Sequence, residues 1–575
     1  EDTWQNAGLD KASEDETIAY FEELFKEELD GHRIVSNKSV WRNFPVISAE
    51  KWSHENIVLI GDAVHTAQFS IGSGTKIAME DAIALSGSVV RSGFTDGNIH
   101  EALTQYETER KDIIARLQRT ALVSLSWYEN ARRYNVLSPK QYAFNFLSRN
   151  KGVTYENLKL RDPVYGADIN HWYSDLVRKN QGFEISLDNP PPPMFTPFSV
   201  GQLTLQNRVV VAPMCQYSAK DGTPTDWQLV HLGNFAKGGA GLVITEMTNV
   251  SPEGRISHQC TGLYHSDHVP AWRRIVDFVH NETNSKICVQ LGHAGRKASC
   301  NIGWIDGGAP LKNGKWQILA PSSIPFSPTS AIPKEMDRSD MDKVRDDYVR
   351  SAQMAAEAGF DMIEFHGAHG YLLSSFISPI SNVRTDNYGG SLENRMRFPL
   401  EVLSAVRNVW PSEKPISVRI SAEDWVGDRG NTGAEAVIIA KLFYDTGADI
   451  IHVSAGQTSS EQKPIYGRMF QTHLSEQVRL ECGIPTMAVG NITTPDQINT
   501  ILAAGRADLV TLARPHLANP FFTLHAAAHY NWGGQVWPNQ YLRGKDQAFK
   551  EAEVHNLRQK ELLLANKPKT HSDEI

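Results

Sequence analysis

Residues 362–371, MIEFHGAHGY, place a short apolar run directly before two histidines and a tyrosine. Continuous apolar runs of this length are typical of strands that are buried on both faces. Seven further runs alternate with segments of helical pattern: NRVVVAPMC (207–215), GLVITEM (241–247), KICVQLGH (286–293), ISVRIS (416–421), IIHVSA (450–455), PTMAVG (485–490) and DLVTLAR (508–514). Eight such strands predict an α/β fold of the (β/α)₈ (TIM) barrel type, with an open doubly wound sheet as the alternative.

Composition excludes several classes of function. The chain carries 57 Lys and Arg against 66 Asp and Glu, a net charge of −9, without the long basic block that nucleic acid requires. Its 5 cysteines lack CxxC spacing, which argues against a disulfide framework and a zinc site, so we expect no metal. No apolar run approaches the roughly 20 residues that span a bilayer, and the acidic start is unlike a signal peptide. We expect a soluble, cytoplasmic protein that binds no membrane.

A run of four prolines marks the expected domain boundary. In LDNPPPPMFTPF (187–198), the prolines at 190–193 remove backbone donors and stiffen the chain into an extended connector. Residues 1–189 contain too little strand pattern for a complete α/β domain. We therefore expect a partial α/β domain over 1–189, the linker at 190–193, the barrel over 194–540 and a helical tail over 541–575.

The carboxyl ends of the eight strands carry reactive side chains. Active sites of barrels are assembled at these ends, so position along each run selects the candidates. A barrel without function would more often end its strands in Gly, Ser, Asp and Asn. The candidates are Pro213, Met214, Cys215, Glu246, Met247, Gln290, His293, His366, His369, Arg419, Gly490, Asn491, Ala513 and Arg514.

The two histidines after the fourth run are three residues apart. If the turn is helical, the rings of His366 and His369 share a face and can both donate to one carbonyl oxygen. Such a pair would polarise an enone or stabilise its enolate. An ordinary structural pair of histidines is equally open at this point, whereas a metal site lacks a third ligand.

The seventh and eighth strand ends, in AVGN and LARPHLANPF, lie where barrels commonly bind phosphate, with Arg514 as a further contact. Gln290 can pair with an amide-like heterocycle edge, and Arg419 can stabilise negative charge. A phosphate at one side and a uracil-like ring in the middle describe flavin mononucleotide (FMN). A surface-pairing role for Arg419 remains the alternative.

These motifs together resemble the old yellow enzyme family of FMN-dependent ene-reductases, in its branch with a cysteine near the flavin. The resemblance covers about residues 194–522 and is carried by APMCQYSA, QLGHAGRK, HGAHGYLLSSFISPISNVRTDNYGGSLENRMRF, VRISAEDW and LARPHLANPF. It implies that NADH or NADPH reduces FMN, which passes hydride to an electron-poor alkene in a small-molecule substrate.

The resemblance also implies roles for single residues. His366 and His369 would hold the substrate carbonyl oxygen, Tyr371 would donate a proton, and Cys215 would tune the flavin, with a buried apolar thiol as the alternative reading of Cys215. Met247 stands where the family often has a smaller residue. The implied FMN contacts are Pro213, Met214, Cys215, Met247, Gln290, Arg419, Gly490, Asn491, Ala513 and Arg514.

Residues 59–82, LIGDAVHTAQFSIGSGTKIAMEDA, form a second candidate site near the N-terminus. Asp62 offers acceptor oxygens for sugar-like hydroxyls, and Gly72 and Gly74 let a ligand approach a helix N-terminus. Asp81 lies inside the apolar row of that helix, so we expect it to bond backbone rather than ligand. An ordinary strand, turn and helix is the plain alternative.

This stretch resembles the second flavin-binding motif of the aromatic-ring monooxygenases related to para-hydroxybenzoate hydroxylase. The resemblance implies that Asp62 contacts the ribityl chain of FAD, although the usual proline after the histidine is absent from HTAQFSIGSG. No GxGxxG follows a strand near the N-terminus, so we expect a truncated FAD domain. The polypeptide would bind FMN, and it would bind FAD only if a front half were supplied.

Joined to the barrel, this motif resembles fused aromatic acyl-CoA monooxygenase/reductases. That resemblance implies an aromatic acyl-CoA thioester as substrate and O₂ as co-substrate. We also expect a homo-oligomer. Two alternatives stay open: a stand-alone ene-reductase of broad specificity in which residues 1–189 are a scaffold, and a flavin electron carrier without its own substrate.

Overall fold

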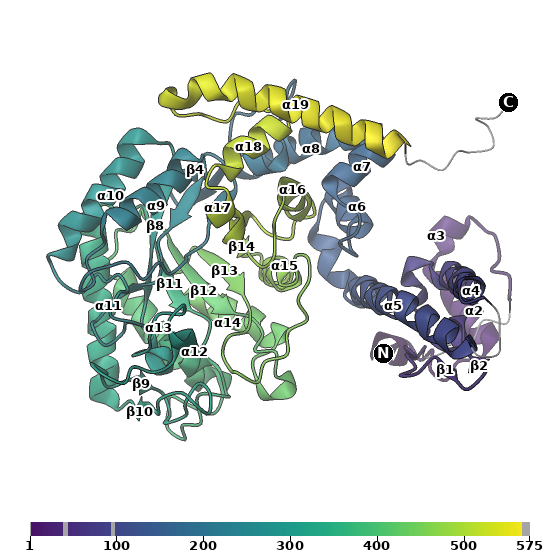
Figure 1. The fold of residues 1–575 in the computed structure, drawn as a ribbon, viewed down its shortest axis with the longest axis horizontal. Helices are drawn as coiled ribbons and strands as arrows, with labels where there is room; N and C mark the ends of the chain where they lie inside the picture. The colour runs from purple at the N-terminus through teal and green to yellow at the C-terminus, as the bar shows by residue number, and fades with distance from the viewer. Residues whose placement is uncertain (1, 38–43, 94–97, 566–575) are drawn as a thin grey trace. The chain divides into compact units, whose positions relative to one another are not determined.

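A computed structural model describes residues 2–37, 44–93 and 98–565, which form two compact units, Glu1–Glu129 and Asn130–Ile575 (Figure 1). Each unit is described by itself. Within the described residues, none of the helices combines the length and the apolar character that crossing a membrane requires.

Eight parallel strands of the second unit close into a barrel. They are β5 (Val209–Val211), β6 (Leu242–Ile244), β8 (Lys286–Gly292), β11 (Met362–Gly367), β12 (Ile416–Ser421), β13 (Ile450–Ser454), β14 (Thr486–Ala488) and β15 (Leu509–Leu512). The last strand pairs with the first, Val510 opposite Val209, so the eight-stranded ladder closes on itself. The predicted barrel is confirmed and the open sheet is wrong, because an open sheet would leave both edge strands unpaired.

Helices surround the barrel in the order that the alternating pattern predicts (Figure 1). They are α9 (Asp226–Lys237), α10 (His268–Glu282), α11 (Arg338–Ala358), α12 (Leu372–Ile377), α13 (Leu392–Arg407), α14 (Gly433–Asp445), α15 (Thr472–Cys482), α16 (Pro495–Ala503), α17 (Arg514–Ala518) and α18 (Phe522–His529). Local sequence sets their ends. Asp337 and Asp340 form a reciprocal cap at the start of α11, and Gly359 ends that helix at φ 95°.

Two short pairs of strands lie outside the barrel ladder. The hairpin of β3 (Phe198–Val200) and β4 (Leu203–Leu205) shares an apolar cluster with inward residues of the barrel strands, including Val210 and Met487. β9 (Leu319–Ala320) pairs with β10 (Lys334–Glu335), and β7 (Thr248–Asn249) extends the ladder beside β8. The hairpin therefore fills one end of the barrel and leaves the strand carboxyl ends for the site.

Three helices before the barrel, α6 (Pro139–Leu147), α7 (Tyr155–Arg161) and α8 (Pro163–Gln181), belong to the second unit. Asn145 on α6 donates to the Glu476 carboxylate at 2.7 Å and to the Ala504 carbonyl at 2.8 Å. The prolines at 190–193 also lie within this unit, and α19 (Leu542–Ala565) follows the barrel. The domain boundary expected at the linker 190–193 stays a prediction.

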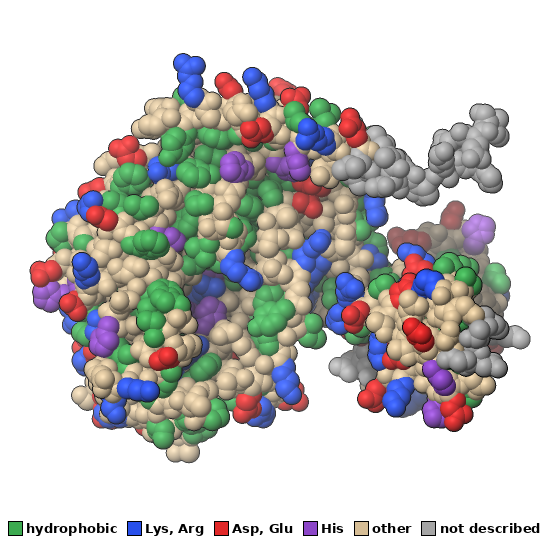
Figure 2. Space-filling model, in the orientation of Figure 1, with side chains coloured by type: hydrophobic (Ala, Val, Ile, Leu, Met, Phe, Trp, Pro, Cys, Tyr) green, Lys and Arg blue, Asp and Glu red, His purple; other side chains and the backbone are tan. Residues whose placement is uncertain are grey.

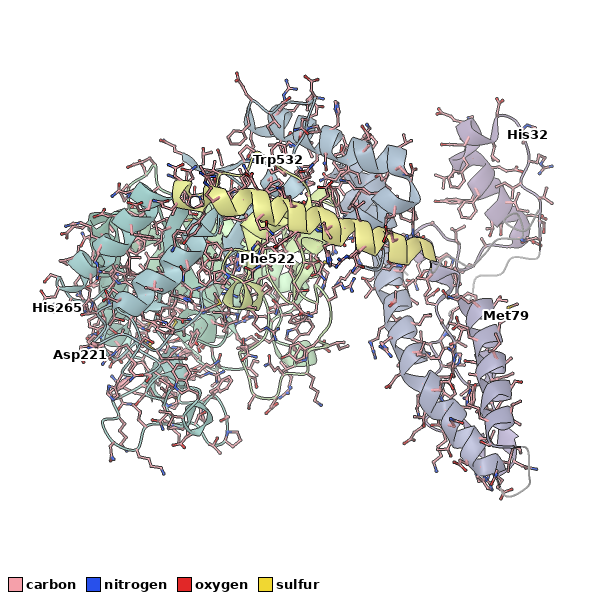
Figure 3. All side chains as sticks on the ribbon, turned by 45° about the horizontal axis from the view of Figure 1, so that its top comes forward. His32, Met79, Asp221, His265, Phe522 and Trp532 are labelled. Carbon is pink, nitrogen blue, oxygen red and sulfur yellow. The ribbon has the colours of Figure 1, made fainter. Side chains whose placement is uncertain are left out.

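The first unit is small. It contains α1 (Asp2–Asn6), α2 (Glu14–Leu24), α3 (Lys26–Leu29), the hairpin of β1 (Ser53–His54) and β2 (Ile57–Val58), α4 (Gly74–Arg91) and α5 (Ile99–Glu129). Its core gathers Trp52, Val64, Ile77 and Tyr106 between the hairpin and the two long helices. Met79, on the face of α4 turned away from α5 in Figure 3, is 62% exposed. The opposite face of α4 therefore packs into the core of this unit.

Candidate active site

The polar ends of the barrel strands meet at one end of the barrel. Figure 2 shows this face hollowed where β11 and β12 lie in Figure 1, with histidine and basic side chains gathered in the hollow. The register sets His366 of β11 opposite Arg419 of β12 and sets Arg419 opposite His452 of β13. The closed ladder thus brings together residues that the sequence separates by up to 86 positions, from 366 to 452.

His366 is buried and presents one ring N–H. The Ala368 backbone N–H donates to its Nδ1 at 3.3 Å, so the ring proton lies on Nε2. Burial and the nearby Arg419 charge hold the pKa of His366 well below its usual value, which keeps the ring neutral. The rings of His369 and Tyr371 lie 5.0 and 4.7 Å from it, centroid to centroid. The three predicted side chains therefore form one cluster.

The turn that carries His369 is not helical, so the condition under which helical spacing would bring the two rings together is not met. β11 ends at Gly367, and His369 has φ 62°, in the left-handed region. Its N–H donates to Ser421 Oγ at 2.9 Å and its Nε2 lies 2.8 Å from Ser454 Oγ. The next residue must be glycine, because a Cβ on Gly370 would lie 2.8 Å from the Gln457 carbonyl. Packing of this turn, rather than helix periodicity, brings the two imidazoles together.

A buried carboxylate lies beneath this cluster and was not anticipated. Glu364 accepts from Gln290 Nε2 at 2.8 Å and from Ser417 Oγ at 2.9 Å, and it lies 2.9 Å from His452 Nδ1. Burial alone would raise its pKa, but His452 and Arg419 hold it below the usual value. A charged residue inside the apolar run MIEFHG was the available signal. Gln290 is therefore fixed by a neighbouring strand rather than free.

Arg419 is buried, 7% exposed, and its Nε–H has no partner among the described residues. Burial lowers the pKa of the guanidinium, and Glu364 supplies the main opposing negative charge. The surface-pairing alternative for Arg419 is wrong, because the side chain lies inside the barrel. An unpartnered buried donor is costly unless a ligand accepts from it.

The ends of β5 and β6 supply a more apolar wall. Cys215 and Tyr371 pack against a cluster that contains Met247 and Cys260. Burial raises the pKa of Cys215 well above its usual value, so the thiol stays protonated. Met247 occupies the space beside Gly292, where a Cβ would lie 2.6 Å from the Met247 Cγ. Pro213 and Met214 precede Cys215 on the same half-buried loop.

The ends of β14 and β15 are more open. Gly490 has φ 114°, and a Cβ there would lie 3.0 Å from the Gln471 Oε1. Asn491 donates to the Gly467 carbonyl at 2.9 Å. Ala513 caps the short helix that begins at Arg514, whose side chain is exposed. These strands are neighbours in the ladder, so the four residues border one region.

Glu246 and His293 are two further predicted strand-end residues. His293 is buried, and its Nε2 has no hydrogen-bond partner among the described residues. Glu246 accepts from the Gln216 N–H at 3.0 Å and from Gln228 Nε2 at 3.1 Å. Burial raises the pKa of Glu246 to about 7. Both residues line the barrel end without reaching the histidine cluster through any described hydrogen bond.

The N-terminal candidate differs from the barrel site in exposure. Asp62 and Gly72 are exposed, and Gly74 begins α4. Asp81 is fully buried and, as expected, bonds backbone: it accepts from the Gly61 N–H at 3.1 Å. Together with His65 and Arg110, it fixes the turn that carries Asp62.

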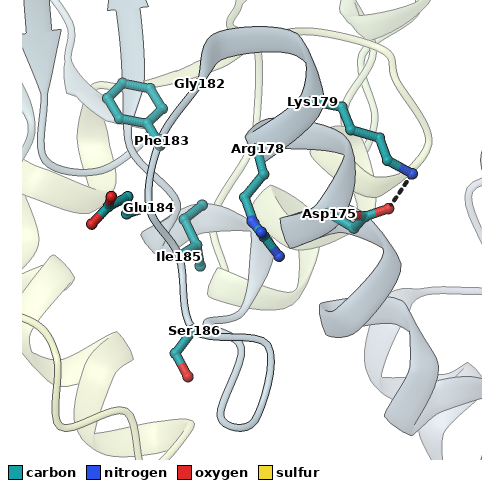
Figure 4. A pocket seen from close by; sticks show the side chains of 8 residues that line it. All are labelled: Asp175, Arg178, Lys179, Gly182, Phe183, Glu184, Ile185 and Ser186. Atoms are coloured by element: carbon teal, nitrogen blue, oxygen red, sulfur yellow. Dashed lines mark ion pairs between the residues drawn. The ribbon is translucent and has the colours of Figure 1, made fainter.

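A separate open cavity of about 650 Å³ lies beside the end of α8 (Figure 4). It is bordered by the Asp175–Lys179 ion pair and by Arg178 and Phe183. None of these residues follows a barrel strand. The cavity is therefore distinct from the strand-end cluster.

Comparisons with known proteins agree with this geometry. The family described as NADH:flavin oxidoreductase / NADH oxidase matches residues 193–532, and a family described as FAD binding domain matches residues 3–121. The chain is 42% identical to an NADPH dehydrogenase of Geobacillus thermodenitrificans over 353 residues, 61% of this chain and 98% of that protein. It is 41% identical to an NADPH dehydrogenase of Clostridium acetobutylicum, over 58% of this chain and 94% of that protein.

Solved structures of similar proteins include an acyl-CoA complex. The chain resembles 2-naphthoyl-CoA reductase in complex with 2-naphthoyl-CoA, at TM-score 0.52 and 26% identity over 57% of this chain and 51% of that one. It thus spans about half of that reductase. It also resembles morphinone reductase in complex with tetrahydroNAD, at TM-score 0.50 and 28% identity over 61% of this chain and 93% of that one. The chain belongs to the NADH:flavin oxidoreductase / NADH oxidase family, its barrel is of the old yellow enzyme type, and an FAD-binding region precedes it.

Proposed function

We propose that the barrel reduces a carbon–carbon double bond conjugated to a carbonyl group, with FMN as cofactor and NADH or NADPH as reductant. The observation that carries this proposal is the cluster of neutral His366, His369 and Tyr371 beside the unpartnered Arg419 donor. An electron carrier would need no such set of donors for a substrate oxygen. Alkene reduction requires a cation that stabilises the reduced flavin ring and a pair of donors that bind the substrate carbonyl.

The donor set of the barrel suits FMN. The free Nε–H of Arg419 and the fixed Gln290 would face the heterocycle, with Pro213, Met214, Cys215 and Met247 along its edge. The open region at Gly490, Asn491, Ala513 and Arg514 would hold the phosphate. FMN bound there would supply hydride transfer from the nicotinamide to the β-carbon of the alkene.

The residues of the chain bind the substrate oxygen and move the proton. His366 donates its Nε2–H to the carbonyl oxygen and stays neutral. If the Ser454 hydroxyl donates to His369 Nε2, the Nδ1–H of His369 becomes the second donor. Burial raises the pKa of Tyr371 well above its usual value, so its hydroxyl stays protonated and can supply a proton to the α-carbon. The hydride and this proton together saturate the double bond.

We further propose an aromatic acyl-CoA thioester as the substrate, of the 2-aminobenzoyl-CoA (anthraniloyl-CoA) type. Two observations support this class. A similar reductase was solved with 2-naphthoyl-CoA, and an FAD-binding region is joined to the barrel in this chain. The N-terminal unit would then belong to a monooxygenase that uses O₂ on the same thioester, with Asp62, Gly72 and Gly74 against FAD. A homo-oligomer remains a prediction.

Rapid mixing tests the reductase proposal. The purified chain is assayed for released FMN and FAD, reduced anaerobically with NADPH, and mixed with an aromatic or enoyl CoA thioester or with cyclohexenone. We expect about one FMN per polypeptide and flavin reoxidation by the thioester. Equal rates with cyclohexenone would favour a stand-alone reductase of broad specificity. Absence of FMN would refute the proposal.

A further inference from the structure

A second cavity lies on the loops that follow β8, β11 and β13. Its volume is about 260 Å³, and Arg296, Phe326, Ile380, Ser459 and Ser460 line it. Loops after barrel strands lie at the strand carboxyl ends, so the cavity and the proposed reductase site share one face of the barrel.

Two adjacent cations join the cavity to the site. Lys297 Nζ donates to the His369 carbonyl at 2.9 Å and to the Gln457 carbonyl at 3.2 Å, and it lies 4.3 Å from the centre of the Phe326 ring. Arg296 donates to the Thr458 carbonyl, and its other contacts, to the Ile324 and Pro325 carbonyls, are long at 3.5 and 3.4 Å. Backbone carbonyls are thus the described hydrogen-bond acceptors of both cations.

These charges lack a carboxylate partner. Among the described residues, neither Arg296 nor Lys297 forms an ion pair, and the Nε–H of Arg296, a residue only 3% exposed, has no acceptor. Burial lowers the pKa of Arg296 to about 10, and burial together with the Arg296 charge lowers that of Lys297 to about 8. Glu461, the carboxylate at the cavity, already pairs with Arg429 at 2.7 Å. Asp424 supplies the opposing negative charge near Arg296 without forming an ion pair with it, and Lys297 is half-buried. The Arg296 Nε–H remains a buried donor without an acceptor, which is costly unless a ligand accepts from it.

We infer that Arg296 and Lys297 form a phosphate-binding subsite that holds the charged part of a ligand during the proposed reduction. A guanidinium fork matches the oxygens of phosphate, and the serines that line the cavity can donate to the remaining oxygens. The subsite rests on the proposed function for its purpose, because both the reductant NADPH and a CoA thioester carry phosphate. The shared phosphate chemistry is what the cavity recognises.

Ser459 allows a test that leaves the two cations in place. Its Oγ accepts from the Glu461 N–H at 3.1 Å, and an Asp or Asn side chain can keep this bond. Ser459→Asp adds a negative charge to the wall of the cavity, and Ser459→Asn is the neutral control of the same size. Titration calorimetry with adenosine 2′,5′-bisphosphate and with coenzyme A, on the FMN-loaded full chain, reports binding without turnover.

We expect the Kd of at least one probe to rise about tenfold in Ser459→Asp relative to Ser459→Asn, which corresponds to about 1.4 kcal/mol. A rise for the bisphosphate alone assigns the subsite to NADPH, and a rise for coenzyme A alone assigns it to the thioester. Equal affinities of the two variants for both probes, or no binding by the unmodified chain, overturn the subsite. Binding is measured apart from reduction. If the Kd differs between the two variants but the chain reduces no alkene, the proposed function is rejected and the subsite stands.

Discussion

The two candidate flavin regions of this chain were both predicted from motif residues, but they differ in burial. In the barrel, Gln290 and Arg419 are 1% and 7% exposed and are set by a closed ladder of strands. In the N-terminal unit, Asp62 lies exposed on a short turn, and the buried polar residue behind it, Asp81, bonds the turn itself. A motif becomes a preorganised site only where the surrounding fold desolvates it and fixes its donors.

Of the tests of this comparison, removal of the buried cation Arg419 should have the largest effect. In Arg419→Met, a donor without a protein partner is lost together with its positive charge, so we expect FMN to fall from about one to below about 0.1 per polypeptide. Flavin released by denaturation gives the count. Arg419→Lys, which keeps the charge, should retain part of the FMN. Full FMN in the Met variant would show that burial of this group does not determine binding.

The carbonyl-binding pair is the next test. In His366→Ala, reoxidation of the reduced flavin by an enone should slow about 10²- to 10³-fold, the usual loss when one oxyanion donor is removed. Stopped-flow absorbance after anaerobic reduction measures this step. His366→Asn keeps a donor and should lose less. An unchanged rate in the Ala variant would instead support the electron-carrier alternative.

In the N-terminal unit, the corresponding test concerns stability. Asp81 lies 2.7 Å from His65 Nε2 and accepts from Arg110 Nε at 2.9 Å, so Asp81→Ala leaves a buried guanidinium without this partner. We expect a loss of about 3 kcal/mol in hydrogen-exchange protection across β1, β2 and α4. Asp81→Asn, which can still accept, should lose less. Equal loss of protection in the barrel would contradict the division into two units.

Sequence patterns predicted the barrel because its eight apolar runs each correspond to one strand and because strand ends define the active face. They did not predict Glu364 and His452, which meet only when β11, β12 and β13 align in register. The left-handed residue His369 is followed by Gly370, which lies close to the Gln457 carbonyl, 87 positions away in the sequence, from 370 to 457. Local periodicity carries no information about such contacts, so from the sequence a helical turn was only a condition under which the two rings would meet.

The exposed aspartate of the first unit should give the smallest effect. Asp62→Ala removes a side chain that faces solvent, so we expect the free energy of unfolding to change by no more than about 0.5 kcal/mol and the FMN content to stay the same. Added FAD, followed by equilibrium dialysis, should bind the unmodified chain weakly, because the Asp62 side chain is exposed to solvent. If the unmodified chain instead binds one FAD tightly and Asp62→Ala abolishes it, an exposed motif suffices, and burial is not what separates the two regions.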